Sequence, residues 1–251
     1  MGTRLSVVIP AYNEASRIGR TLDRICGYMN GRDSLYDVIV VDDGSDDHTV
    51  RIVRDFMGRY PAISLLQNGV NRGKGYSVRR GILHSGGSYV LVSDADLSTP
   101  IEEIDRLYKA LEDGYDIAIG SRALLESVIL EEQPWYRQLM GKTFNKFVQG
   151  IAVKGISDTQ CGFKLFKGDA ARAIFSRQRI DRFAFDVEAL YLAKRMGFSI
   201  REVPVVWINS PDSKVRIFRD SLQMLNDLVK IRSYHYRPKR ARNPLYRPKS
   251  V

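Results

Sequence analysis

The chain has 251 residues, of which 44% are hydrophobic and 27% are charged, and its formal net charge is +10. This composition is typical of a soluble globular protein, and the length is sufficient for one large domain with a sizeable core. No apolar run approaches the roughly 18–20 residues that a membrane-spanning helix needs. We expect no signal peptide, because the N-terminus leads directly into a predicted strand. The positive charge predicts an anionic partner: a phospholipid surface, a nucleic acid or a phosphorylated substrate.

The first half of the chain alternates predicted strands and helices. Apolar, β-branched runs predict the strands, and apolar residues at helical spacing predict the helices. Such alternation predicts an α/β protein with a mostly parallel sheet flanked by helices. The predicted strands are Leu5–Pro10, Asp37–Asp42, Ala62–Leu66, Tyr89–Val92 and Tyr115–Gly120. The predicted helices are Ala15–Met29, a helix capped by Ser45 or Asp46 that ends near Arg59, a helix from the turn Asn71–Gly75 to His84, and Pro100–Leu111 with Ser98 and Thr99 as its cap.

The second half is less regular. Apolar residues recur at helical spacing over Trp135–Ile151, which predicts an amphipathic helix that lies either in the core or at a surface. Two distant cysteines match no metal-binding spacing, so we expect free thiols in a reducing compartment. The remaining predicted elements are a polar turn and short strand at Asp158–Lys164, a helix that opens at Phe183–Glu188, a strand over Phe198–Trp207 and a final helix from Ile217.

Three polar clusters follow predicted strands: Tyr12–Glu14, Asp42–Asp43, and the pair Asp94 and Asp96. In a doubly wound sheet, ligands bind beyond the carboxyl ends of the strands. Asp94 and Asp96 stand two residues apart, so their carboxylates point the same way and form a site for Mg²⁺ or Mn²⁺ with open positions for substrate phosphates. Alternatively, the two carboxylates only solvate the strand end. The metal site is the favoured interpretation, because the other two polar clusters also follow predicted strands.

The C-terminal tail, residues 232–251, is rich in Lys and Arg, contains interleaved tyrosines and has no acidic residue. One interpretation is a solvated, partly disordered segment. The other is attraction to anionic headgroups, on the order of 1 kcal/mol for each basic residue near the surface. Charge alone also allows nucleic acid, but no nucleic-acid module accompanies the tail, so we expect no nucleic-acid partner. Residues 1–231 are expected to form a single domain, with a nucleotide-binding half to about residue 100 and an acceptor half after it.

Five motifs together resemble the family 2 glycosyltransferases, which are inverting enzymes of the GT-A fold. They are Val7–Glu14, Val41–Ser45, Asn71–Gly75, Asp94–Asp96 and Gly120–Arg122. Two later stretches, Val153–Phe166 and Phe183–Glu188, look like the dolichyl-phosphate β-glucosyltransferases and, less closely, the dolichyl-phosphate mannose synthases. The resemblance extends to about Ile231. The chain has Ser98 where the mannose synthases have Gln.

The resemblance implies a UDP-sugar donor, UDP-glucose, and a polyprenyl phosphate acceptor of the dolichyl type. It also implies Mg²⁺ or Mn²⁺, held by Asp96 with Asp94 bound directly or through water. Such an enzyme would lie peripherally on the inner, cytoplasmic face of a membrane and dock on its anionic surface. The alternatives are a soluble family 2 glycosyltransferase with a hydroxyl acceptor and a GDP-mannose-dependent synthase.

The resemblance further assigns roles to individual side chains. Arg122 and Arg137 are candidates for the acceptor phosphate, because guanidinium groups bind phosphate oxygens through two hydrogen bonds. Asp158 either orients one of these arginines, the acceptor or the sugar hydroxyls, or only caps its turn. Asp186 and Glu188 are secondary candidates, because acidic residues are favoured at a helix start without any function. Candidates for the nucleotide sugar are Pro10, Tyr12, Glu14, Asp42, Asp43, Asp94, Arg72, Lys74 and Lys214; the last three also read as exposed basic residues of loops.

Overall fold

The computed structural model describes residues 4–32, 34–131, 145, 148–150, 153–209 and 217–235, with only the backbone described for 217–222. Arg137 and Lys214 lie outside the described residues. So do most of the predicted helix Trp135–Ile151 and the tail after His235.

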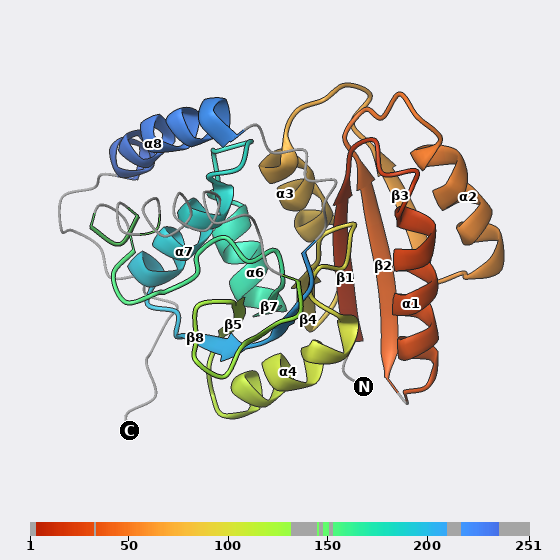
Figure 1. The fold of residues 1–251 in the computed structure, drawn as a ribbon, viewed down its shortest axis with the longest axis horizontal. Helices are drawn as coiled ribbons and strands as arrows, with labels where there is room; N and C mark the ends of the chain where they lie inside the picture. The colour runs from red at the N-terminus through yellow and green to blue at the C-terminus, as the bar shows by residue number, and fades with distance from the viewer. Residues whose placement is uncertain are drawn as a thin grey trace.

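A seven-stranded sheet forms the middle layer of the molecule, in the order β3-β2-β1-β4-β7-β5-β8 (Figure 1). All neighbouring pairs are parallel except those of β7, which runs antiparallel to both β4 and β5. The prediction of a mostly parallel sheet is therefore confirmed. The strands are β1 (Arg4–Ala11), β2 (Leu35–Asp42), β3 (Ile63–Gln67), β4 (Tyr89–Val92), β5 (Ile117–Ser121), β7 (Lys164–Lys167) and β8 (Ile200–Pro204), and a separate parallel pair is formed by β6 (Val128–Ile129) and β9 (Val206–Trp207).

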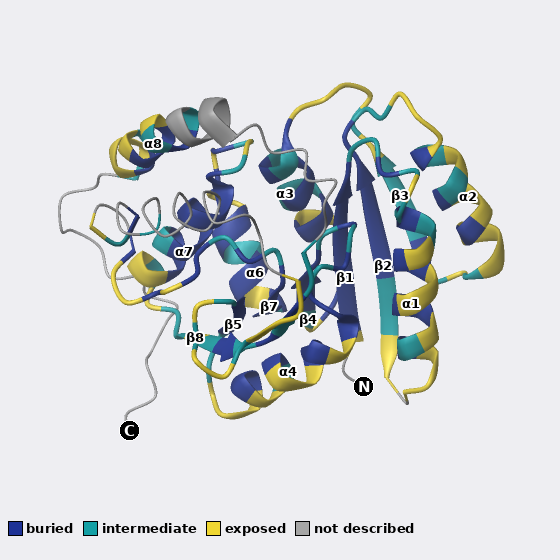
Figure 2. Ribbon diagram, viewed as in Figure 1, coloured by how far each residue is buried: buried dark blue, intermediate teal, exposed yellow. Residues whose placement is uncertain are grey.

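Helices cover both faces of the sheet and create two apolar cores. Alternation along β1 explains why both faces need cover: Val7 and Ile9 pack into one core, and Val8 packs into the other. Figure 2 shows the central strands as buried along most of their length. One face carries α1 (Ile18–Asn30), α2 (Thr49–Arg59) and α4 (Ile104–Glu112), which follows a short 3-10 turn at Ile101–Glu103; the other face carries α3 (Lys74–His84), α6 (Gly168–Phe175), α7 (Phe185–Met196) and α8 (Ile217–Tyr234).

The two capping predictions are wrong. Ser45 accepts the backbone N–H of Asn13 at 2.9 Å instead of capping α2, and Asp47 accepts the N–H of Thr49. The helix α4 has no side-chain cap, and the hydroxyl of Thr99 lies beside the sulfur of Cys161. In both places the polar side chain serves a contact between loops, which local sequence does not show.

Besides the strand β6, which had no prediction, the remaining elements differ from the predictions in the following places. The predicted strand Phe198–Trp207 divides at Val205 into β8 and β9, which belong to different sheets. The helix α6 had no prediction, and α8 continues past residue 231 to Tyr234. Both cysteines are free, as expected, and both are buried. Within the described ranges, no helix combines the length and the apolar character that crossing a bilayer requires.

Candidate active site

The site is built where β1, β2 and β4 end. Ala11 pairs with Asp42 at the ends of β1 and β2, and Val92 of β4 pairs with Val8. Pro10 lies buried in β1 next to this edge. Because these strands are parallel, the three loops that carry the predicted polar clusters leave the sheet at the same edge, as the sequence indicated.

The loop after β1 is fixed by hydrogen bonds to the loop after β2. Asn13 has a positive φ of 54°, a conformation that asparagine adopts more readily than most residues. Its N–H donates to Ser45, and the N–H of Glu14 donates to the hydroxyl of Thr49 at 2.7 Å. Tyr12 remains partly exposed on this loop, whereas Glu14 is buried. The loop therefore has a defined shape.

Asp42 and Asp43 are both buried, but they accept hydrogen bonds from different segments of the chain. Asp42 accepts the backbone N–H groups of residues 44–45 and so closes its own turn. Asp43 accepts the N–H groups of Arg72 and Gly73 at 2.9 and 2.8 Å, and the amide of Asn68 at 2.7 Å. Asp42 therefore shapes the turn after β2, and Asp43 ties that turn to the glycine turn before α3.

That glycine turn requires its glycine. Gly73 has a φ of 110°, and a Cβ atom there would lie 2.4 Å from the carbonyl oxygen of Asp181. Any side chain would be both strained and in collision with the backbone. The turn is therefore held from both sides, which fixes where the next residue, Lys74, points.

The two basic residues of the turn point in different directions. Arg72 is exposed, and its guanidinium lies 4.1 Å from the ring centre of Tyr76. Lys74 turns inward, with its Nζ 2.6 Å from Oδ1 of Asp94. Burial alone would lower the pKa of Lys74, but the carboxylates of Asp94 and Asp186 outweigh burial and raise it. A permanent positive charge thus stands beside the carboxylate pair.

The carboxylates of Asp94 and Asp96 fit a divalent cation. A Cβ atom on Gly162 would lie 2.1 Å from Oδ2 of Asp94, so only glycine leaves room for this carboxylate. Oδ1 of Asp94 is paired with Lys74, whereas Asp96 accepts the N–H of Ser98 with Oδ1 at 3.0 Å and has its Oδ2 3.8 Å from a terminal nitrogen of Arg17. Mg²⁺ is commonly bound through one or two carboxylates and substrate phosphates, so oxygens left available here suit it. Among the described residues, no larger group of His, Cys, Asp or Glu forms a closed metal cage.

Burial and the neighbouring charge of Asp94 raise the pKa of Asp96. Arg17, which the sequence analysis did not single out, opposes this shift. Its Nε and one terminal nitrogen bind the carboxylate of Glu14, and its other terminal nitrogen lies 3.8 Å from Oδ2 of Asp96. Arg17 therefore links the loop after β1 to the carboxylate pair. The sequence feature that could have identified Arg17 is its position three residues after Glu14 at a helix start.

A buried ion pair lies behind the site. Lys164 and Asp186 are both buried, and Nζ of Lys164 donates to Oδ1 of Asp186 at 2.5 Å. Burial raises the pKa of Asp186, and the charge of Asp94 adds to this, whereas Lys164 and Lys74 oppose it. Lys164 was not predicted, because its partner lies on another element of the chain. Its charge joins Lys74 in balancing the acidic groups.

Glu188 has a structural position. It is fully buried and accepts the N–H groups of Arg179 and Ile180 at 3.0 and 2.7 Å. His235, just after α8, bonds the same carboxylate at 2.6 Å. Glu188 thus attaches the end of α8 to the core, which supports the reading of this residue as a helix-start acid without a substrate role.

Arg122 and Asp158 form the most completely bonded ion pair of the site. Oδ2 of Asp158 accepts the backbone N–H and Nε of Arg122 at 3.0 and 2.7 Å, and Oδ1 accepts a terminal guanidinium N–H at 2.9 Å. The guanidinium also lies 5.4 Å from the ring centre of Trp207. Burial alone would raise the pKa of Asp158, but the charge and N–H groups of Arg122 lower it to about 2. Asp158 therefore orients Arg122 and is a poor proton acceptor.

We expect Asp158→Asn to destabilise the folded protein by about 2–3 kcal/mol at neutral pH, because the folded state holds this carboxylate ionised more strongly than the unfolded chain does. The lowered pKa gives stability that is present above the unfolded pKa of about 4 and is lost as the pH falls toward about 2. Urea unfolding of wild type and variant between neutral and acid pH measures this. The exposed Asp113→Asn is the control, and a difference that stays constant down to the lowest pH would contradict the expectation.

Residues 6–175 match the family model described as glycosyl transferase family 2. A protein from Dictyostelium discoideum named dolichyl-phosphate beta-glucosyltransferase is 41% identical over 240 residues, which cover 91% of this chain and 73% of that protein. The protein of the same name from Homo sapiens is 39% identical over 242 residues, which cover 91% of this chain and 75% of that protein.

Among solved structures, glucosyl-3-phosphoglycerate synthase from Mycobacterium tuberculosis, in complex with Mg²⁺ and uridine diphosphate, superposes with a TM-score of 0.66. The match covers 93% of this chain and 79% of that chain at 18% sequence identity. At that identity the likeness shows a common fold.

Proposed function

This chain belongs to the glycosyl transferase family 2 and has a GT-A fold, and from that premise we propose that it transfers glucose from UDP-glucose to a polyprenyl phosphate of the dolichyl type. The main support for the proposal is a sequence identity of about 40% to dolichyl-phosphate beta-glucosyltransferases over nine-tenths of the chain. The geometry supports it, because Asp158 orients the cation Arg122 and the loop that begins at Asp158 packs against the carboxylate of Asp94 at Gly162.

The donor half of the site follows from β1, β2 and β4. Asp96, with Asp94, would hold Mg²⁺ or Mn²⁺, and the bound ion would supply a Lewis acid for the charge of the leaving diphosphate. Lys74 adds a fixed positive charge next to this position. The uracil and ribose lie against the loops that carry Pro10, Tyr12, Glu14, Asp42 and Asp43, and Arg72 and Lys214 are further donor-site candidates.

The acceptor half is organised by Arg122. A phosphate monoester is largely ionised near neutral pH, since its second pKa is about 6, so it needs cationic positioning more than a general base. Arg122 and Arg137 supply that positioning, and Asp158 holds the first of them in place. A hydroxyl acceptor would need a base, and the lowered pKa of Asp158 makes it unsuited to that role. A phosphate acceptor is therefore favoured over the hydroxyl alternative.

We expect the protein to prefer UDP over GDP as the nucleotide of its donor. Ser98 and the stretch Val153–Phe166 support this, because they separate the chain from the mannose synthases that it resembles less closely. Calorimetric titration with UDP and GDP in the presence of Mg²⁺ compares the two affinities. A matching assay offers UDP-glucose, UDP-galactose and GDP-mannose with one polyprenyl phosphate and extracts the lipid-linked sugar. Tighter GDP binding with mannose transfer would move the assignment to a mannose synthase.

Residues near Arg122 suit a lipid acceptor. Leu125 and Val128–Leu130 are exposed apolar side chains shortly after it in the chain, and exposed apolar residues of this kind suit an interaction surface. We propose that this surface, the predicted helix Trp135–Ile151 and the basic tail dock the enzyme peripherally on the cytoplasmic face of a membrane. Apolar burial combined with attraction to anionic lipid would hold it there.

Vesicle binding is expected to increase with anionic lipid and to weaken at high salt, where screening shortens to about 3 Å at 1 M. Removal of residues 236–251 should reduce transfer to a vesicle-borne acceptor much more than transfer to a short, soluble polyprenyl phosphate. This truncation keeps His235 and its bond to Glu188. Equal losses on both acceptors would show that the tail supports the active site, and membrane docking by the tail would then be abandoned.

A further inference from the structure

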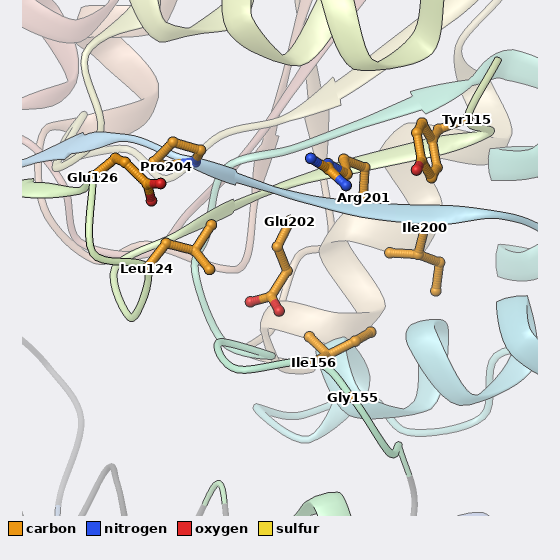
Figure 3. Close-up of a pocket in the computed structure, with 9 residues that line it drawn as sticks. All are labelled: Tyr115, Leu124, Glu126, Gly155, Ile156, Ile200, Arg201, Glu202 and Pro204. Atoms are coloured by element: carbon orange, nitrogen blue, oxygen red, sulfur yellow. The ribbon is translucent and has the colours of Figure 1, made fainter. Parts of the chain in front are cut away.

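A pocket of about 570 Å³ opens at the β8 edge of the sheet (Figure 3). Neither Asp94 nor Asp96 lines it. Figure 3 shows Arg201 and Glu202 leaving opposite sides of β8, with the Glu202 carboxylate directed toward Ile156. This carboxylate belongs to no cluster that the sequence analysis identified.

Glu202 binds the backbone of the loop that carries Asp158. Its Oε2 accepts the N–H of Ser157 at 2.7 Å, and its Oε1 accepts the N–H of Asp158 at 2.9 Å. An ionised carboxylate forms stronger hydrogen bonds to N–H groups than a neutral acceptor does. Because two consecutive N–H groups bind one carboxylate, both the position and the orientation of the loop at Asp158 are fixed.

The position of Arg122, the partner of Asp158, is also fixed. Arg122 follows directly on β5, whose Ser121 pairs with Pro204 of β8. Ile119 of β5 pairs with Glu202 itself. The adjacent strands β5 and β8 therefore position the two partners of the ion pair. Arg122 follows β5, and Glu202 of β8 holds the loop that carries Asp158.

We propose that Glu202 is a positioning residue for the acceptor phosphate. It touches neither Arg122 nor the substrate; it acts by fixing the Asp158 loop, so that Asp158 presents both carboxylate oxygens to Arg122. The proposal rests on the proposed function in one respect, namely that Arg122 binds the acceptor phosphate. The proposal makes the carboxylate of Glu202, which binds the Asp158 loop from the side of β8, a determinant of acceptor affinity.

The test compares Glu202→Gln and Glu202→Ala with wild type. Glutamine keeps one oxygen for one N–H but turns an NH₂ group toward the other, and alanine removes both acceptors. Steady-state kinetics with a short, soluble polyprenyl phosphate should show an acceptor KM raised about tenfold in Glu202→Gln, the loss expected for one charge-assisted hydrogen bond. The affinity for UDP with Mg²⁺, measured by calorimetry, should stay unchanged. Glu126→Gln is the matched control, because Glu126 lines the same pocket and is exposed.

A second readout does not depend on activity. Hydrogen exchange followed by NMR should show faster exchange of the Ser157 and Asp158 amides in Glu202→Gln, and unchanged exchange in Glu126→Gln. An unchanged acceptor KM in both Glu202 variants would overturn the proposal. A joint loss of UDP affinity and melting temperature in Glu202→Gln would also overturn it, because Glu202 would then support the whole fold.

Failure of the proposed function and failure of the positioning role of Glu202 give different experimental results. If the wild-type protein makes no lipid-linked sugar, the proposed function fails and the acceptor role of Glu202 fails with it. If the wild-type protein is active and Glu202→Gln leaves both the acceptor KM and the two amides unchanged, only the positioning role fails.

Discussion

Asp96→Ala is expected to reduce the rate of sugar transfer at least about a hundredfold, the size of effect seen when one group that stabilises developing charge is removed. Asp96 and Asp94 are the acidic pair at the end of β4, and Gly162 leaves the space that Asp94 needs. Without Asp96, a divalent cation would lose one of its two proposed protein ligands, and the charge of the leaving diphosphate would be less well balanced. Initial rates of transfer with saturating donor measure the effect.

The same substitution is expected to leave the melting temperature of the metal-free protein unchanged or slightly higher. The pKa of Asp96 is raised in the folded state, so ionisation of this carboxyl at neutral pH costs stability and its removal does not. Excess chelator should reproduce the loss of transfer in the wild-type protein. Asp55→Ala, which removes an exposed aspartate of α2, is the control. Transfer at an undiminished rate in excess chelator would remove the metal from the mechanism.

Arg122→Lys is expected to lower kcat/KM for the phosphate acceptor about a hundredfold, because lysine keeps the charge but lacks the planar fork that can bind a phosphate and Asp158 together. Lysine is preferred to alanine as the test, since alanine would leave the buried Asp158 without a counter-charge and could unfold the protein. Kinetics with varied acceptor concentration at saturating UDP-glucose give the measurement.

UDP affinity provides the control within the same variant, because Arg122 is assigned to the acceptor. The exposed Arg195→Lys on α7 provides a matched control, because Arg195 is not among the proposed site residues. An equal fall in UDP affinity and acceptor turnover in Arg122→Lys would place this residue in the donor half. Full activity would remove it from the mechanism.

The parts of the fold that the sequence predicts well are those governed by local periodicity. Alternation of Val7, Val8 and Ile9 specifies a strand covered on both faces, and the polar clusters at strand ends follow from a parallel arrangement. The antiparallel direction of β7 was not predictable in this way. Its four residues, Lys164–Lys167, indicate a strand, but the direction depends on its partners β4 and β5.

The parts of the site that escaped prediction depend on contacts between distant segments. Lys164 meets Asp186 on another element, and Glu202 meets the loop at Asp158 across 44 residues of sequence. Arg17 resembles any basic residue near a helix start until the fold brings Asp96 next to it. Such long-range partners leave no periodic pattern, so only the folded chain shows them.

A paired transfer assay tests the identity of the acceptor most directly. The wild-type protein is incubated with Mg²⁺ and radiolabelled UDP-glucose in identical vesicles that contain either a polyprenyl phosphate or the corresponding polyprenol, which ends in a hydroxyl. We expect label in the lipid extract only with the phosphate, because Asp158 holds Arg122, the proposed phosphate-binding cation, and with its lowered pKa is a poor base for a hydroxyl. Equal or greater labelling of the polyprenol, or no labelled lipid with either acceptor, would contradict it.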